Sequence, residues 1–464
     1  MQKLIAKYGL AAHLAILAVA PLLLFPFCAA ASVATVLLWL SLSAGLWMLF
    51  EPSLREGEQP HNARYRVALK LVRDPLTWIL LAVALIAGFR ALNTGIAFAY
   101  DAEAAVWHVS SANVSIFPGV VGSAGALEFS ASVAFLVLVQ SCRHSMGRSA
   151  RTVFLLMSSS LAGLAALLDL WAVFKGHADV RSLLSFGEMR TYSFIGFSFG
   201  LYLLGGIAAL VGVYEHLWKI AFFLAFLGIA GTCAGLFAFA PSYLALGLFA
   251  LAFLLLLYSA FYAYWKTRST VGFKLLVFAG ISLTFGGLMV AFLLPAGVLE
   301  ARLEELGAIQ FFPMNYWAFR RLLSDVAFES WVSHLWIGTG LGSFALDFRF
   351  AATPEDWLLL PKGVEALANG WWLLLAEQGV VGFVLLVLPF ALLLGSYVYR
   401  LVAGFAGLSL PHPVLVVLPL AFVLFIAGGF FDCSPFRIEA LMATGSLAAV
   451  SAASISRMRR GENG

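Results

Sequence analysis

Long runs of apolar residues recur along this chain, and short polar segments separate them. Most runs approach or exceed about 20 residues, the length that an α-helix needs to cross roughly 30 Å of hydrocarbon. The pattern therefore predicts an all-α, polytopic transmembrane protein with a single transmembrane domain over residues 1–464. Its twelve expected spans lie near residues 9–28, 32–50, 76–96, 124–141, 152–174, 193–214, 219–240, 243–264, 275–295, 371–398, 412–430 and 438–454.

Composition supports a membrane protein. Hydrophobic residues make up 62% of the chain and charged residues only 11%, whereas soluble domains are about a quarter charged. The first run follows Lys3 and Lys7 like a secretory leader, but a second run, 33–50, follows at once and favours a helical hairpin. The four cysteines lack CxxC spacing and indicate neither a metal site nor a disulfide.

The basic residues sort by loop and do not gather on one soluble face, so the net charge of +4 does not indicate a nucleic-acid partner. With both termini in the cytoplasm, most of the lysines and arginines fall on the cytoplasmic side, as the positive-inside rule requires. The cytoplasmic set includes Arg55, Arg64, Arg66, Lys70, Arg73, Arg143, Arg148, Arg151, Lys266, Arg268 and Lys274.

Two external segments are longer than a connection requires. The first covers about residues 97–123. The second, 296–370, is a large periplasmic loop between the ninth and tenth spans, and loops of this size in a compact protein are usually functional or disordered. Apolar residues within it recur at spacings of three and four, which predicts an amphipathic helix lying on the outer membrane surface, with a polar face of Arg320, Arg321, Asp325 and Glu329.

Arginines on the external side are candidates for binding phosphate, because guanidinium groups grip phosphate in a bidentate manner and stay charged. Arg320 and Arg321 are the strongest of these, although snorkelling to lipid headgroups is the structural alternative. His334 precedes Gly338, Gly340 and Gly342, which permit a tight reversal. This histidine could accept a proton or could simply hydrogen-bond within the loop.

The stretch "ANGWWLLLAEQGVVGFVLL" carries polar groups that would be costly in lipid. Asn369 suits an N-cap, which places Glu377 about 12 Å inside the helix, where a carboxylate is either functional or paired. Gly379 and Gly382 would let another helix approach closely.

Three further ionisable residues lie near the external ends of their spans and are interpreted as interfacial. They are Arg90, Glu128 and Asp169, and we expect Asp169 to be buried and paired. The chain has no Gly-rich phosphate loop, HExxH or nucleophile elbow. This argues against a nucleotide-driven pump, a zinc protease and a serine hydrolase.

The same stretch resembles the end of the periplasmic loop in O-antigen ligases and O-antigen polymerases, and "RRLLSDVAFESWVSHLWIGTGLGSF" resembles the element before it. "MRTYSFIGFSFGLYLL" is similar to an earlier arginine segment of that family. The resemblance implies transfer of a glycan from undecaprenyl pyrophosphate, with neither cofactor nor metal. It assigns Arg190 and Arg320 or Arg321 to the pyrophosphate, and it matches Asn369 and Glu377 to the family's asparagine and glutamate.

Two positions depart from the family pattern. Ala368 replaces the histidine expected before the asparagine, and Tyr243 replaces an arginine at the start of a later helix. His334 and Glu377 are therefore the candidates for the proton acceptor, with Asn369 and Tyr243 in supporting positions.

The expected function is an inverting, metal-independent glycosyltransferase or polymerase in a bacterial inner membrane. Its partners would be a lipid-linked oligosaccharide donor, a glycan, lipid or protein acceptor, and membrane lipids. Two alternatives stay open: a transporter or flippase for a lipid-linked saccharide, and a non-catalytic subunit of a polysaccharide assembly complex.

Overall fold

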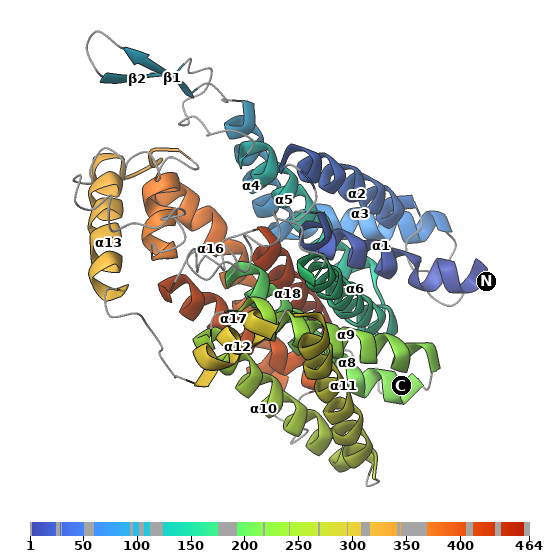
Figure 1. The fold of residues 1–464 in the computed structure, drawn as a ribbon. Helices are drawn as coiled ribbons and strands as arrows, with labels where there is room; N and C mark the ends of the chain where they lie inside the picture. The colour runs from blue at the N-terminus through green and yellow to red at the C-terminus, as the bar shows by residue number, and fades with distance from the viewer. Residues whose placement is uncertain are drawn as a thin grey trace.

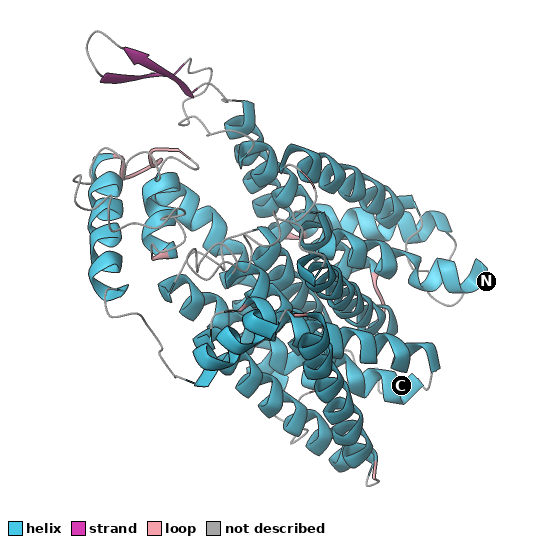
Figure 2. Cartoon of the chain, viewed as in Figure 1, coloured by secondary structure: helices cyan, strands magenta, loops and turns pink. Residues whose placement is uncertain are grey.

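The computed structural model of the chain gives an almost entirely helical protein (Figures 1 and 2). The structure describes residues 2–24, 28, 30–50, 60–92, 96–101, 106–111, 124–174, 193–216, 219–240, 242–267, 270–294, 296–307, 316–340, 344, 369–404, 412–431 and 438–458. It describes the side chains of most, but not all, of them, and the rest of the chain is outside the described residues.

Within these described residues, ten helices are long and apolar enough to cross a membrane. They are α2 (Ala30–Phe50), α4 (Pro75–Leu92), α5 (Ala124–Gln140), α6 (Arg148–Phe174), α8 (Ser193–His216), α9 (Lys219–Phe239), α10 (Ser242–Thr267), α11 (Val271–Leu293), α16 (Gly370–Gly404) and α17 (Pro413–Phe431). The first and last predicted spans correspond to α1 (Gln2–Leu24) and α18 (Ile438–Met458), whose apolar stretches are shorter. The prediction of a polytopic helical membrane protein is confirmed.

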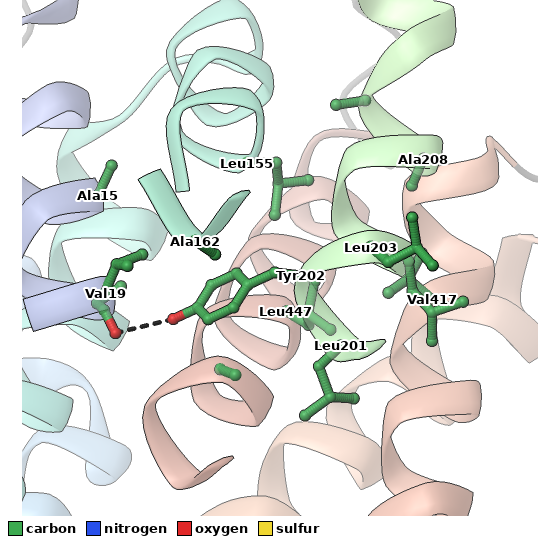
Figure 3. Packing of buried hydrophobic residues seen from close by; sticks show 14 of the residues in the cluster. Ala15, Val19, Leu155, Ala162, Leu201, Tyr202, Leu203, Ala208, Val417 and Leu447 are labelled. Atoms are coloured by element: carbon green, nitrogen blue, oxygen red, sulfur yellow. Dashed lines mark hydrogen bonds between the residues drawn. The ribbon is translucent and has the colours of Figure 1, made fainter. Parts of the chain in front are cut away.

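Helix α8 lies at the centre of the bundle. Its apolar stretch, Ile195–Val213, is wholly buried, and α6, α9, α10, α17 and α18 all pack against it. A buried tyrosine needs a partner for its hydroxyl. Tyr202 finds one on α1, where its hydroxyl donates to the carbonyl oxygen of Ala18 at 2.8 Å (Figure 3).

Helices α6 and α9 pack so closely that their backbones touch. A Cβ on Gly231 would collide with the backbone of Gly163, so small residues are required where these helices meet. This is the manner in which helices associate in lipid, where no hydrophobic effect drives them together.

Two short strands form a hairpin after α4, in the segment that the sequence had predicted only as an external loop. Strand β1 (Ile96–Asp101) pairs antiparallel with β2 (Val106–Ser111), with Ile96 opposite Ser111. The hairpin projects beyond α4 and α5, and α13 (Tyr316–Ser333) lies near the same end of the bundle (Figure 1). We call this end, which carries β1, β2 and α13, the hairpin end. Helix α12 (Ala296–Gly307) lies between α11 and α13 in the chain.

A polar cluster stabilises the opposite end of α4, where the basic loop contains a helix, α3 (Pro60–Arg73). Asp74 caps α4 by accepting from the backbone N–H of Leu76 at 3.2 Å. Its other oxygen lies 2.7 Å from Nη1 of Arg143 and 3.1 Å from Nε2 of His144, beside the π-helix η1 (Ser141–Ser145). Burial raises the pKa of this carboxyl, but the His144 hydrogen bond and the Arg143 charge outweigh burial and hold the pKa below its ordinary value of 3.8.

Candidate functional site

Helix α16 is broken near its beginning. Gly379 has φ 63° and ψ −172°, far from helical values, and φ in this range favours glycine. The rings of Trp371 and Phe383 lie 5.7 Å apart, although an unbroken helix would separate the two residues by about 18 Å along its axis. The segment 370–378 therefore folds back over the start of the span, where Nε1 of Trp371 donates to the carbonyl of Ile426 on α17 at 3.3 Å.

The turn that follows α13 fills this break. Gly379 interrupts the helix where the N–H groups of Val380 and Val381 would bond the carbonyls of Ala376 and Glu377. The turn satisfies all four groups, which buried backbone requires. The bonds run from Val380 N to Leu335 O (3.0 Å), Val381 N to Trp336 O (3.0 Å), Thr339 N to Ala376 O (2.9 Å) and Gly340 N to Glu377 O (2.9 Å). We call this set of four bonds the stitch.

The stitch is possible because each of the two segments that it joins contains a glycine at the point of contact. Gly338 has φ 69°, and a Cβ there would collide with the backbone of Glu377. A Cβ on Gly379 would collide with the backbone of Trp336. The predicted reversal is confirmed at Gly338 and at Gly340, whose φ is 116°. Gly342 lies outside the described residues.

This arrangement corrects the expected role of Gly379 and Gly382. The segment that approaches Gly379 is the turn and not another helix. Gly382 instead leaves room for the side chain of Gln378, which a Cβ would strike, and for Nη2 of Arg90.

A buried polar cluster lies beside the break. Nη1 of Arg90, at the end of α4, donates to Oε1 of Glu128 on α5 and to Oε1 of Gln378 on α16, at 3.2 Å in each case. Arg90 is almost fully buried and Glu128 mostly so, whereas the sequence had singled out Asp169 as the residue expected to be buried and paired. Desolvated charges need such partners, and here the pair ties α4 and α5 to the break.

Helix α13 packs against the folded-back part of α16 through its apolar face. Leu323, Val326 and Ala327 are buried in one cluster with Phe344 and Ala376. The amphipathic helix was therefore predicted correctly, but the sequence did not predict that α16 covers this part of its apolar face. Protein side chains on α16, and not lipid, cover it.

The structure brings together the two segments that contain the predicted proton acceptors. His334 is exposed in the turn, where its carbonyl accepts from the N–H of Gly338 at 2.9 Å. Glu377 is half-buried, and its Oε1 accepts from the N–H of Phe344 at 3.3 Å. Because the uncharged stretch 380–399 is already about 20 residues long, Glu377 lies at the edge of the apolar span and not 12 Å inside it.

The predicted phosphate-binding arginines are placed only in part. Arg190 lies outside the described residues, and the side chain of Arg320 on α13 is not described. The Arg321 side chain is 86% exposed and lies 3.9 Å from Asp325, so it points into solvent. Tyr243 is on α10, but its side chain is not described either.

Asn369 is the N-cap that its sequence position predicts. Its Oδ1 accepts from the N–H of Trp371 at 3.0 Å, which orients the start of α16. Asp169 is buried, as predicted, but among the residues that the structure describes none forms a hydrogen bond or ion pair with its carboxylate.

Sequence reasoning missed the cluster of Arg90, Glu128 and Gln378, although a signal for it was present. Arg90 closes one predicted span and Glu128 opens the next, so both had to lie at the same end of neighbouring helices. Opposite charges so placed form a pair more readily than either faces lipid. Only the contact of Gln378 with this pair could not be predicted without the tertiary structure.

The arrangement offers a carboxylate, an imidazole and several backbone groups at the edge of the membrane span. Within the described part of the chain, no three His, Cys, Asp or Glu residues gather where they could hold a metal ion. The chain matches no protein-family model, no curated protein and no solved structure.

Proposed function

We propose that this protein transfers or polymerises a glycan carried on undecaprenyl pyrophosphate at the periplasmic face of a bacterial inner membrane. The observation that carries the proposal is the stitch, because it joins the turn 334–340 to the start of α16. These two segments are the ones in which the sequence resembles O-antigen ligases and polymerases. The hairpin end would then face the periplasm, and both termini would face the cytoplasm.

The proposed reaction is a single displacement. A hydroxyl oxygen of the acceptor forms a bond to the anomeric carbon, while the bond from that carbon to the pyrophosphate oxygen breaks and its electron pair leaves with the pyrophosphate. Glu377 or His334 would take the hydroxyl proton, a contribution of about 10²–10⁴ in rate. Arg190 and Arg320 would stabilise the charge that develops on the leaving group.

The test is replacement of the proposed phosphate ligands in cells that depend on this chain for surface polysaccharide. Arg190→Ala and Arg320→Ala should shorten or detach the glycan on gels. Arg64→Ala is the matched control, because Arg64 bonds the carbonyl of Phe50 near α3, far from the stitch. Unchanged glycan length and attachment in both test variants, at normal protein levels, would remove the proposal.

The broken helix supports a second candidate, a transporter for a lipid-linked saccharide, since discontinuous helices are typical of transporter binding sites. Reconstituted protein distinguishes the two. A transporter would move a labelled polyprenyl-linked saccharide between leaflets without changing the glycan, whereas a transferase would release polyprenyl pyrophosphate.

A further inference from the structure

Helix α13 and the turn after it expose a second apolar surface, which adjoins the face that packs on α16 at Phe328, whose ring centroid lies 5.4 Å from that of Trp372. It consists of Phe328, Val332, Leu335 and Trp336, which are 45%, 54%, 39% and 65% exposed. Their spacing of four, seven and eight residues places them along one side of the helix and its continuation. We call this surface the α13 ridge. A contiguous exposed apolar surface of this kind marks an interaction site.

The stitch fixes the level of the ridge relative to the membrane. The carbonyls of Leu335 and Trp336 accept from Val380 and Val381. These valines begin the uncharged stretch 380–399, which is about 20 residues long and so just spans roughly 30 Å of hydrocarbon. The ridge residues in the turn therefore lie level with the boundary between headgroups and hydrocarbon, the layer in which tryptophan concentrates.

The charge of the exposed side chains also changes along α13, from its beginning toward the end that reaches the level of the membrane. Near its beginning, the exposed side of the helix carries Arg321 and Asp325, both highly exposed. One helical turn later exposed Glu329 is the last charged residue of the helix, and exposed apolar side chains follow on this side at Val332 and Trp336. A helix that is charged at the end away from the membrane level and apolar at the end that reaches it fits the gradient of polarity across an interface.

We propose that the α13 ridge inserts into the membrane interface at the hairpin end, where lipid acyl chains cover Val332, Leu335 and Trp336. The stitch and the ridge then hold the α13 segment from two sides, by backbone bonds to α16 and by burial in lipid. This inference is independent of the proposed reaction, since it uses only the fold and the membrane span.

Spin-label accessibility tests the proposal in the full chain. Single cysteines replace Val332 or Trp336 in a variant without native cysteines, and the labelled protein is reconstituted in vesicles of phosphatidylethanolamine and phosphatidylglycerol. Oxygen concentrates in lipid, whereas a nickel chelate stays in water. We expect the ratio of oxygen to chelate accessibility at both sites to be several-fold higher than at a label on Glu329→Cys, since Glu329 is exposed.

Matched controls define the two extremes. Arg321→Cys reports an aqueous site on the same helix, and Val384→Cys reports a lipid-facing site on α16, where Val384 is exposed along the span. If positions 332 and 336 match position 321, the ridge faces water and the proposal is wrong. Low accessibility to both reagents would mean that protein, such as a second copy of the chain, covers the ridge, which also overturns it. The labelled positions are all exposed, and a melting curve of the variant without native cysteines checks that replacing buried Cys142 and Cys233 leaves the protein folded.

Discussion

Gly338 and Gly379 each lie against the backbone of the other's neighbours: a Cβ on Gly338 would strike Glu377, and a Cβ on Gly379 would strike Trp336. Both glycines also have positive φ, at 69° and 63°. The contact is thus reciprocal, and it depends on two residues that are 41 positions apart in the sequence. Neither segment could adopt its observed form without the other.

Gly379→Ala should open the stitch. Alanine in this region of φ and ψ, which is essentially restricted to glycine, costs about 1–3 kcal/mol, and the collision with Trp336 adds to that cost. We expect faster hydrogen exchange at the amides of Val380 and Val381, measured by mass spectrometry of the peptide that contains them, together with a lower melting temperature.

Gly395→Ala is the control for this variant. Gly395 lies in the same helix and a Cβ there would meet nothing within 4 Å. It should be neutral or stabilising by up to about 1 kcal/mol, because alanine favours helix. Equal exchange at Val380 and Val381 in the two variants would show that the stitch does not protect these amides.

Arg90→Met should be strongly destabilising, because it leaves the carboxylate of Glu128 buried without its cation. The expected loss is about 3–5 kcal/mol, as for other broken buried pairs. The double variant Arg90→Met/Glu128→Met removes both charges and should be more stable than Arg90→Met alone. Melting curves of the two single variants and the double variant form the test. Additive losses would mean that the pair is not coupled.

Much of this fold could be predicted from hydrophobic pattern alone. Lipid excludes unsatisfied backbone, so each long apolar run had to be a helix, and the expected spans match the observed helices. Local sequence also predicted the N-cap, because Asn369 can accept from the first N–H groups of the helix. The helical period predicted the buried positions Leu323, Val326 and Ala327.

Long-range contacts could not be predicted in this way. The periodicity of α13 shows which face is apolar, but lipid and α16 are equally apolar, so the sequence could not say which of them covers it. The stitch is made of backbone bonds, which carry no residue-type signal apart from Gly338 and Gly379. The hairpin β1–β2 was not predicted, because only the length and charge of its segment had indicated a structure.

Asp74 should make stability depend on pH in the acid range only. Its folded pKa lies below 3.8, so its hydrogen bonds and ion pair contribute in full above that pH and are lost as pH falls through the folded value. Asp74→Asn should cost roughly 1.5–3 kcal/mol near neutral pH. The difference in melting temperature from the unchanged protein should persist down to about pH 4.5 and shrink only at lower pH.

Asp325→Asn serves as the comparison for Asp74, since Asp325 is exposed and only 3.9 Å from an exposed Arg321. Surface pairs of this kind are worth about 0–1 kcal/mol, so no pH-dependent difference is expected. A difference for Asp74→Asn that vanished already near pH 6 would contradict the assignment.

Glu377→Gln separates a chemical role for this residue from a structural one. Glutamine keeps an oxygen at Oε1 that can still accept from the N–H of Phe344, so the stitch should hold and melting should change little. The amide cannot take a proton, however, so a transferase that uses Glu377 as its base should lose about 10²–10⁴ in rate. His334→Gln, in the exposed turn, tests the alternative acceptor in the same assay of surface glycan. Normal glycan from Glu377→Gln together with loss in His334→Gln would assign the proton to the histidine, and normal glycan from both would leave no base at the stitch.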